Sequence, residues 1–291
     1  MTVHITHAHQ RRPFALDAQL KGLSQLIGSL LLSLTGWAAP LYAQLNMGIS
    51  EGEDQVSVAR LRSALWITTG LSAGSIHFQS SDVSIKARVD ALPVVALGGD
   101  LWGTESYGVM FRSELGLGAQ LEIPALQDDQ TLSYNHTHTL LGGRYRWHLT
   151  EGERAPALDL GMGLRWQTES VPLQRPTYFV DRLTLCPAVT LGFQLPLTDQ
   201  LSASIGGAYS RHLLIREDPA DSGEMVGSSA LSVQGQVSFM FSALLGVTLQ
   251  GGYRLDHIEF DGFGTRASGV EDGRSDRGFW NASAGLKVAI R

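Results

Sequence analysis

The sequence predicts an all-β protein, folded as a single antiparallel transmembrane barrel of about ten strands, with counts from roughly eight to twelve left open. Three observations predict this class. Apolar residues recur at every second position, which is the period of a strand with one apolar face. Glycine makes up 33 of 291 residues, against a usual share of about 7%. The alternating segments are also separated by connections that are short and long in turn.

The composition narrows the class of protein further. Charged residues are 17% of the chain and the net charge is −6, whereas an average soluble domain has about 25% charged residues. A hydrophobic share of 43% argues against a disordered chain. The arginines are scattered and form no basic stripe, so we expect no nucleic-acid partner. Cys186 is the single cysteine, which excludes an intramolecular disulfide and a cysteine-rich zinc site.

An apolar stretch near the N-terminus predicts a secretory signal peptide. Residues 22–39 are mostly apolar or small, they follow Lys21 and the pair Arg11–Arg12, and Ala43 offers a small residue for cleavage. This order of a basic lead, an apolar core and a small residue is typical of secretory signals. Two alternatives stay open, because the arginine pair could mark a twin-arginine signal and the stretch could be retained as a membrane anchor.

Ten segments after the signal carry the period of two. The pattern is clearest where Leu245, Val247 and Leu249 alternate with small or polar residues. Pro93 predicts a bulge or an edge in the second segment, because proline cannot donate a hydrogen bond to the ladder. The first segment is the least defined, since residues 74–79 fit either this strand or a separate one. The expected strands are 56–70, 83–102, 106–123, 131–149, 155–168, 178–196, 200–216, 229–241, 244–260 and 278–291.

The connections between these segments alternate in length. Short ones are expected at 103–105, 198–199 and 242–243. Longer, more polar ones are expected at 71–82, 124–130, 169–177, 217–228 and 261–277. Bacterial outer-membrane barrels have short periplasmic turns and long extracellular loops. An even strand count then places both ends of the barrel domain on the periplasmic side.

The two faces of the expected strands differ in character. One face is mostly Gly, Ser, Thr, Gln and Ala with isolated charges, which suits a narrow, crowded interior. The other face is apolar and carries aromatic residues near strand ends, as the interfacial girdles of a membrane barrel do. The alternative is a soluble barrel in which these rings fill the core. The expected girdle consists of Tyr107, Tyr145, Trp147, Trp166, Phe241, Tyr253 and Trp280.

On these patterns the chain resembles small Gram-negative outer-membrane β-barrel proteins of the porin-like superfamily. The resemblance covers residues 44–291 and rests on alternation, loop asymmetry and aromatic placement. It implies a signal peptide over 1–43, a barrel domain over 44–291, residence in the bacterial outer membrane and contact with outer-membrane lipid. One departure is the C-terminus: such proteins often end on an aromatic residue, whereas this chain ends on Ile290–Arg291.

A ten-stranded barrel invites comparison with the omptin-type outer-membrane proteases, whose activity depends on an aspartate pair facing an Asp-x-His pair. The nearest match is Asp256–His257. These residues are adjacent, so they point to opposite faces of a strand. Asp128–Asp129 lies in a polar connection without an identifiable partner. The sequence therefore gives little support to proteolysis.

Two further groups could carry chemistry. His212, Ser210 and Ser204 share the polar face of one expected strand, and a serine within reach of a histidine can act as a nucleophile. We interpret these serines as ordinary wall residues.

The second group is a set of histidines. His136 and His138 share one face, and His148 has the same parity, but a metal site needs a third or fourth ligand. We expect neither a metal nor a cofactor. Cys186 is interpreted as a small filler residue.

The remaining group is a set of charged residues on the polar face of the expected strands, the face that points into the barrel. They are Arg88, Asp90, Arg112, Glu114, Arg144, Arg146, Asp159, Arg165, Arg182, Arg254, Asp256 and Lys287. Opposite charges could pair across strands and fill the barrel, or an arginine excess could line a narrow pore that selects anions. Barrels of about eight strands are filled, whereas open channels appear at about 16 to 18, so we favour a plugged or very narrow lumen.

These observations favour a structural or surface-interaction barrel, not an enzyme, whose long loops bind a protein or another envelope component. The alternative is a porin-like conduit for ions or small solutes. A less favoured alternative is an enzyme at the barrel rim that hydrolyses lipid or peptide. The sequence leaves the oligomeric state open.

Overall fold

We analysed a computed structural model of the chain. It describes residues 63–81, 84–122, 132–152, 154–171, 180–218, 220–265 and 270–290, all of which lie in the compact unit Gln55–Arg291. The predicted signal peptide over 1–43 and the pair Asp128–Asp129 lie outside the described residues. Within those ranges, no helix is long and apolar enough to cross a membrane.

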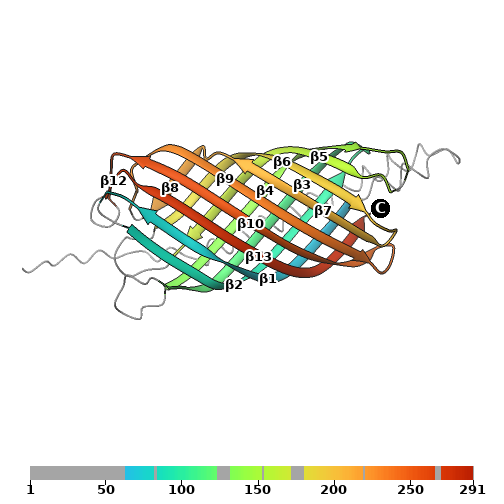
Figure 1. Cartoon of the computed structure of the whole chain (residues 1–291), viewed down its shortest axis with the longest axis horizontal. Coiled ribbons are helices and arrows are strands. Elements are labelled where there is room, and N and C mark those ends of the chain that lie inside the picture. The colour runs from blue at the N-terminus through green and yellow to red at the C-terminus, as the bar shows by residue number, and fades with distance from the viewer. Residues whose placement is uncertain are drawn as a thin grey trace, which may run out of the picture. The chain divides into compact units, whose positions relative to one another are not determined.

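The described residues form one closed antiparallel barrel (Figure 1). It has ten strand positions around its circumference, and we call each position a stave. The strands from β1 to β7 pair in chain order, β7 pairs with β9, β9 with β10 and β10 with β13, and β13 returns to β1. The strands are β1 (Ser63–Gln79), β2 (Ser84–Trp102), β3 (Tyr107–Glu122), β4 (Leu132–His148), β5 (Ala157–Ser170), β6 (Asp181–Pro196), β7 (Leu201–Ser210), β8 (Leu214–Asp218), β9 (Glu224–Met240), β10 (Leu245–Asp261) and β13 (Arg274–Ile290). Both β7 and β8 pair with β6 and together make one stave. A small separate hairpin joins β11 (Phe263–Gly264) to β12 (Val270–Glu271).

The pairing register sets the tilt and width of the barrel. Successive partners lead from Ala64 through every stave and back to β1 at Ile76, twelve residues further along. With strands about 4.8 Å apart and a rise of about 3.3 Å per residue, this stagger tilts the strands by about 40° and gives a backbone radius of about 10 Å. An interior of this width can be filled by side chains.

One end of the barrel carries the connections 103–106, 149–156, 197–200 and 241–244, and we call it the turn end. The opposite end, the loop end, carries the connections 80–83, 123–131, 171–180, 219–223 and 262–273. The structure confirms the predicted all-β class and the single antiparallel barrel of ten strand positions.

The outer wall changes character along the strands. In β10 the outward side chains from Leu245 to Leu255 are apolar, and His257 and Glu259 continue the same face toward the loop end. This apolar stretch of eleven residues spans about 25 Å along the barrel axis, which matches the lipid-facing band of an outer-membrane barrel. The wall beyond it is charged, so the loop end of the barrel stands outside the hydrocarbon.

The interior changes in the opposite sense. Toward the turn end the inward side chains are largely polar, whereas toward the loop end many are apolar and fully buried. The apolar core at the loop end consists of Ile76, Ile85, Ala87, Val89, Leu92, Val94, Ala119, Leu121, Tyr134, Val171 and Phe279. The strands thus have an apolar outer face in the membrane and an apolar inner face beyond it.

The stave formed by β7 and β8 is interrupted between Ser210 and Leu214. Leu213 N–H donates to the carbonyl of Leu185 at 2.8 Å. The backbone N–H and C=O of Leu185 therefore point toward the stave of β7 and β8, and the backbone of Pro187, two residues further along β6, points the same way. Pro187 has no N–H to donate there, which breaks the ladder. Among the described strands, β8 pairs only with β6, and β9 pairs with β7 only from Ala230 onward, so no ladder joins β8 to β9.

Several expected boundaries were wrong in the same direction. The first strand was expected to end at 70 but continues to Gln79, and the connection expected at 71–82 is the short one at 80–83; the expected residues 56–62 lie outside the described residues. Likewise β9 begins before 229 and β13 begins before 278. Each strand continues toward the loop end, past the point where its outward residues stop being apolar.

Candidate functional site in the barrel interior

A cluster of charges crosses the interior near the turn end. The Asp159 carboxylate is buried and accepts from Arg146 Nε at 2.8 Å and from Gln194 Nε2 at 2.9 Å. Arg144 lies 3.2 Å from the same carboxylate and also pairs with Asp100. The Arg146 guanidinium stacks on Trp102, 3.8 Å from the ring centroid. These contacts compensate the two carboxylates and hold both arginines against the wall.

A second cluster lies at mid-height around Glu114. One carboxylate oxygen is 2.8 Å from His136 Nε2, and the other accepts from Asn281 Nδ2 at 3.1 Å. Arg254 NH1 lies 4.0 Å away and adds a positive charge. Glu114 is therefore held by three neighbours from β4, β10 and β13.

A third group of ion pairs lies deeper toward the loop end. Arg165 NH2 is 3.2 Å from Asp256. Arg182 donates to Glu217 at 2.8 and 2.6 Å. The remaining pair is Arg277 and Glu169. These pairs and the apolar core both lie in the loop half of the barrel.

The turn half is hollow by contrast. A vestibule of about 410 Å³ opens at the turn end and shares Arg146, Gln194 and Lys287 with a cavity of about 110 Å³ above it. That cavity shares Trp66 and Arg112 with a third, also of about 110 Å³, which we call the inner cavity. Beyond the inner cavity, the pocket lined by the third group of ion pairs holds only about 10 Å³. The vestibule and the two cavities thus form a connected series that leads inward from the turn end.

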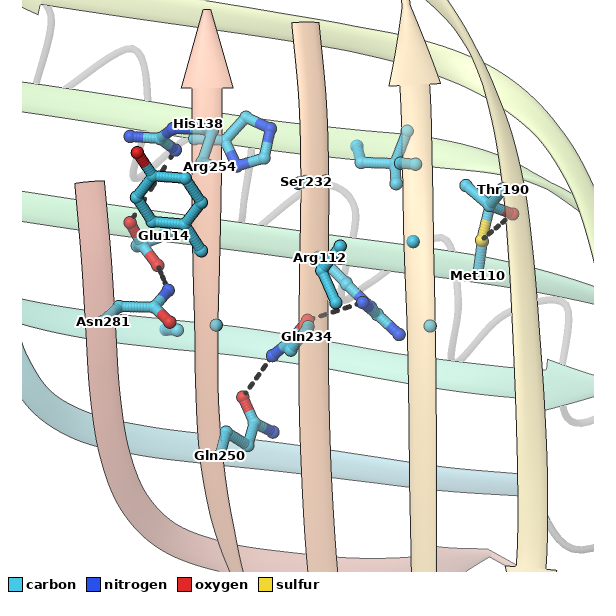
Figure 2. A pocket seen from close by; sticks show the side chains of 18 of the residues that line it. Met110, Arg112, Glu114, His138, Thr190, Ser232, Gln234, Gln250, Arg254 and Asn281 are labelled. Carbon is cyan, nitrogen blue, oxygen red and sulfur yellow. Dashed lines mark hydrogen bonds and ion pairs between the residues drawn. The ribbon is translucent and has the colours of Figure 1, made fainter. Parts of the chain in front are cut away.

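Figure 2 shows a hydrogen-bonded chain of side chains in the inner cavity. Arg112 NH1 donates to Gln234 Oε1 at 2.6 Å, and Gln234 Nε2 donates to Gln250 Oε1 at 3.0 Å. The Gln250 amide nitrogen is buried and has no hydrogen-bond partner within the described residues. The chain therefore ends in free N–H donors.

The charged residues expected in the lumen separate into two groups. Arg88 and Asp90 do not face the interior: their side chains are 72% and 60% exposed on the outer wall. The cause is a bulge, because Asp90 and Ala91 together stand opposite Ala73 between the ladder pairs on either side, which reverses the parity of β2. The others face the interior: Arg112, Glu114, Arg144, Arg146, Asp159, Arg165, Arg182, Arg254, Asp256 and Lys287.

The expected aromatic girdle residues have outward parity and lie at two levels. The turn-end level contains Tyr107, Tyr145, Trp147 and Phe241, all exposed. The Tyr107 and Tyr145 rings lie 5.2 Å apart between centroids. The upper level contains Trp166, Tyr253 and Trp280, which lie further along their strands. The two levels bracket the apolar band of the wall.

The candidate protease pair is separated. Asp256 points inward to Arg165, whereas His257 lies on the outer wall with Nδ1 2.6 Å from Asp276 Oδ1 and Nε2 3.1 Å from Glu259. These are the opposite faces that their adjacency predicts.

The candidates Ser204 and Ser210 of β7 and His212, which lies between β7 and β8, are not joined in a catalytic contact. Ser210 Oγ accepts from Arg165 at 3.3 Å, and both ring nitrogens of His212 are buried without a partner within the described residues. Ser204 lies closer to the turn end and lines the cavity between the vestibule and the inner cavity.

The histidines of β4 face the interior. His136 binds Glu114, His138 lines the inner cavity, and His148 lines the vestibule. Within the described ranges, no three His, Cys, Asp or Glu side chains are grouped to hold a metal ion. Cys186 is buried in β6 opposite Arg165.

No family model matches the sequence, and no curated protein sequence matches it. Among solved structures, the outer-membrane protease OmpT from Escherichia coli is similar at 8% identity, covering 79% of this chain and 97% of that chain with a TM-score of 0.52. The outer-membrane protein OprG from Pseudomonas aeruginosa is similar at 13% identity, covering 79% and 96% with a TM-score of 0.40. The likeness to OmpT concerns the fold. Together with the apolar band of the outer wall, it identifies the chain as a bacterial outer-membrane β-barrel protein.

Proposed function

We propose that this barrel does not conduct and acts as a surface-interaction protein of the outer membrane. The observation that carries the proposal is the closed loop half of the interior. Side chains such as Phe279, Tyr134 and Leu92 are almost fully buried there, and Tyr134 stacks on Phe279 at a centroid distance of 5.9 Å. This packing supports a lumen without a water-filled path along the described strands.

The same half of the barrel offers the surface for interaction. Its outer wall is charged and stands beyond the apolar band, so it faces water. The part of β9 before Ala230 has no ladder partner on the side of β8 among the described strands, and an extended segment of a partner can add to such an edge. Leu213, Leu214 and Val226 are exposed beside this edge. We propose a protein or another envelope component as the partner.

Single-channel recording tests the proposal. The mature chain, shown to be folded by its heat-dependent migration on a gel, is inserted into a planar bilayer beside a porin as positive control. We expect no discrete conductance steps, because the loop half is closed. Reproducible steps from the folded chain would contradict the proposal.

A conduit for small anions is the second candidate, and the hollow turn half favours it. The linked cavities are lined by Arg112, Arg144 and Arg146, and arginine-lined pores select anions. If steps are observed, replacing Arg112 and Arg144 with glutamine should lower the anion selectivity. A hydrolytic role has weaker support, because Ser210 bonds to Arg165 and His257 faces the outer wall.

A further inference from the structure

The inner cavity contains an arginine that makes no close ion pair with a carboxylate of the described residues. Arg112 projects from β3 into this space, and its hydrogen-bond partner is the neutral Gln234 at 2.6 Å (Figure 2). Within the described residues, no ion pair within 4.0 Å includes Arg112. Charges held inside a protein normally have a partner of opposite sign, so this position is incomplete.

The nearby carboxylates are all engaged by other groups. Glu114 is held by His136, Asn281 and Arg254. Asp100 pairs with Arg144. The Asp159 carboxylate takes Arg144, Arg146 and Gln194. The cavities around Arg112 therefore carry an excess of positive charge.

A second, independent observation points to a ligand at the same place. Gln250 is only 7% exposed, and its amide nitrogen has no partner within the described residues. It lines the inner cavity and is connected to Arg112 through Gln234. A guanidinium and an amide N–H₂ are both donors, and together they suit the two oxygen atoms of an oxoanion.

Part of the lining of the inner cavity is apolar. Trp66, Val94, Met110 and Leu140 come from β1 to β4, the strands that also supply Arg112, whereas Gln234, Gln250 and Asn281 come from β9, β10 and β13. The volume of about 110 Å³ has room for several water molecules or a compact organic group. The linked vestibule gives access from the turn end, which is the periplasmic side.

From these features we infer that the inner cavity binds a small organic oxoanion, a carboxylate with a compact apolar body, taken up from the periplasmic side. The Arg112 guanidinium and the Gln250 amide bind the oxygens, and the wall around Trp66 and Met110 contacts the body. This site does not depend on the proposed surface role, since it needs neither the loops nor the edge of β9.

Calorimetric titration of the folded full-length mature barrel in detergent tests the site. The probe is benzoate, with benzyl alcohol as a neutral molecule of similar shape and inorganic phosphate as an oxoanion without an apolar body. We expect benzoate to bind with one-to-one stoichiometry and both comparison molecules to bind at least about tenfold more weakly, because each lacks one half of the recognition.

The variants are Arg112→Gln and Gln250→Leu, with Arg88→Gln as the matched control on the outer wall. Arg112→Gln should lower the affinity for benzoate by at least about tenfold, Gln250→Leu should lower it by a few-fold, and Arg88→Gln should leave it unchanged. Bound benzoate should also raise the midpoint temperature of the gel-shift transition in the parent barrel and not in Arg112→Gln.

Three results would overturn the inference: no saturable benzoate binding, equal affinity for benzyl alcohol, or unchanged affinity in both variants. If Arg112→Gln does not fold, Gln250→Leu alone decides. Conductance does not enter these measurements, so the failure of this site and the failure of the surface role are distinguishable.

Discussion

Arg165 shows what an ion pair does at the centre of this barrel. Its side chain is 1% exposed and lies between Asp256 on the opposite wall and the neighbouring Gln167 and Ser210. The register gives β5 and β10 no backbone contact, so the pair joins two staves through the interior. Removing one member of a buried pair costs more than the pair contributes, because the other charge is left uncompensated.

Asp256→Asn should therefore destabilise the barrel by about 3–5 kcal/mol, measured by urea unfolding in lipid vesicles. Asp90→Asn is the control, since Asp90 is 60% exposed on the outer wall and exposed ion pairs contribute about 0–1 kcal/mol. Equal effects of the two substitutions would mean that Arg165 does not depend on Asp256.

At the scale of strands, the sequence predicts the number, order and turn-end boundaries of the staves well. It is less accurate at the loop end, where the apolar face of the strand changes sides. In β1, Ile67 and Leu71 face outward, whereas Ile76 and Phe78 face inward. A prediction that follows only the alternation of outward apolar residues therefore ends the strand at Gly70, although the strand continues to Gln79.

The interior was only partly predictable, for a similar reason. Alternation places Arg112 and Glu114 inside, but it cannot tell which residue each one meets across the barrel. The bond from Arg112 to Gln234 spans 122 positions, and the register that permits it depends on the whole closed sheet. A bulge that adds one residue also reverses parity. Pro93 signals a bulge or an edge in this strand, but it does not tell that the extra residue lies at Asp90–Ala91 and turns Arg88 and Asp90 outward.

The interruption of the seventh stave leads to an element-scale prediction. Pro187→Ala supplies an N–H that faces the gap between β7 and β8, where the chain runs through Arg211 and Leu213. We expect slow hydrogen exchange at the new amide and slower exchange at 211–213, measured by mass spectrometry. Overall stability should change little, because one added hydrogen bond of about 1 kcal/mol is offset by the greater freedom of the unfolded chain. Fast exchange at position 187 would show that Pro187 is not the cause of the break.

At the scale of the whole molecule, the outer wall of the barrel is exposed to two different environments, hydrocarbon and water. Leu249 lies within the apolar band with 61% of its surface exposed, whereas Gln79 lies on the same outer wall at the loop end. The first side chain meets hydrocarbon and the second meets water. Their responses to an added charge should differ accordingly.

Leu249→Arg should destabilise the barrel by about 2–4 kcal/mol, the cost of an arginine near the middle of the bilayer. Gln79→Arg should change stability by less than about 0.5 kcal/mol, as expected for an exposed polar site. Urea unfolding in vesicles measures both. A similar cost at the two positions would contradict the placement of the membrane boundary between them.

The exchange of apolar and polar faces along each strand also fixes how deep the barrel sits. A slide of two residues toward the cell moves the wall by about 5 Å and brings His257 and Asp276 into hydrocarbon. A slide the other way exposes Leu255 to water and draws the turn-end tyrosines out of the interface. Both displacements raise the free energy, so the barrel does not adapt to a thinner or thicker bilayer by moving along the membrane normal. The lipid around the barrel must instead become locally thicker or thinner to match the apolar band.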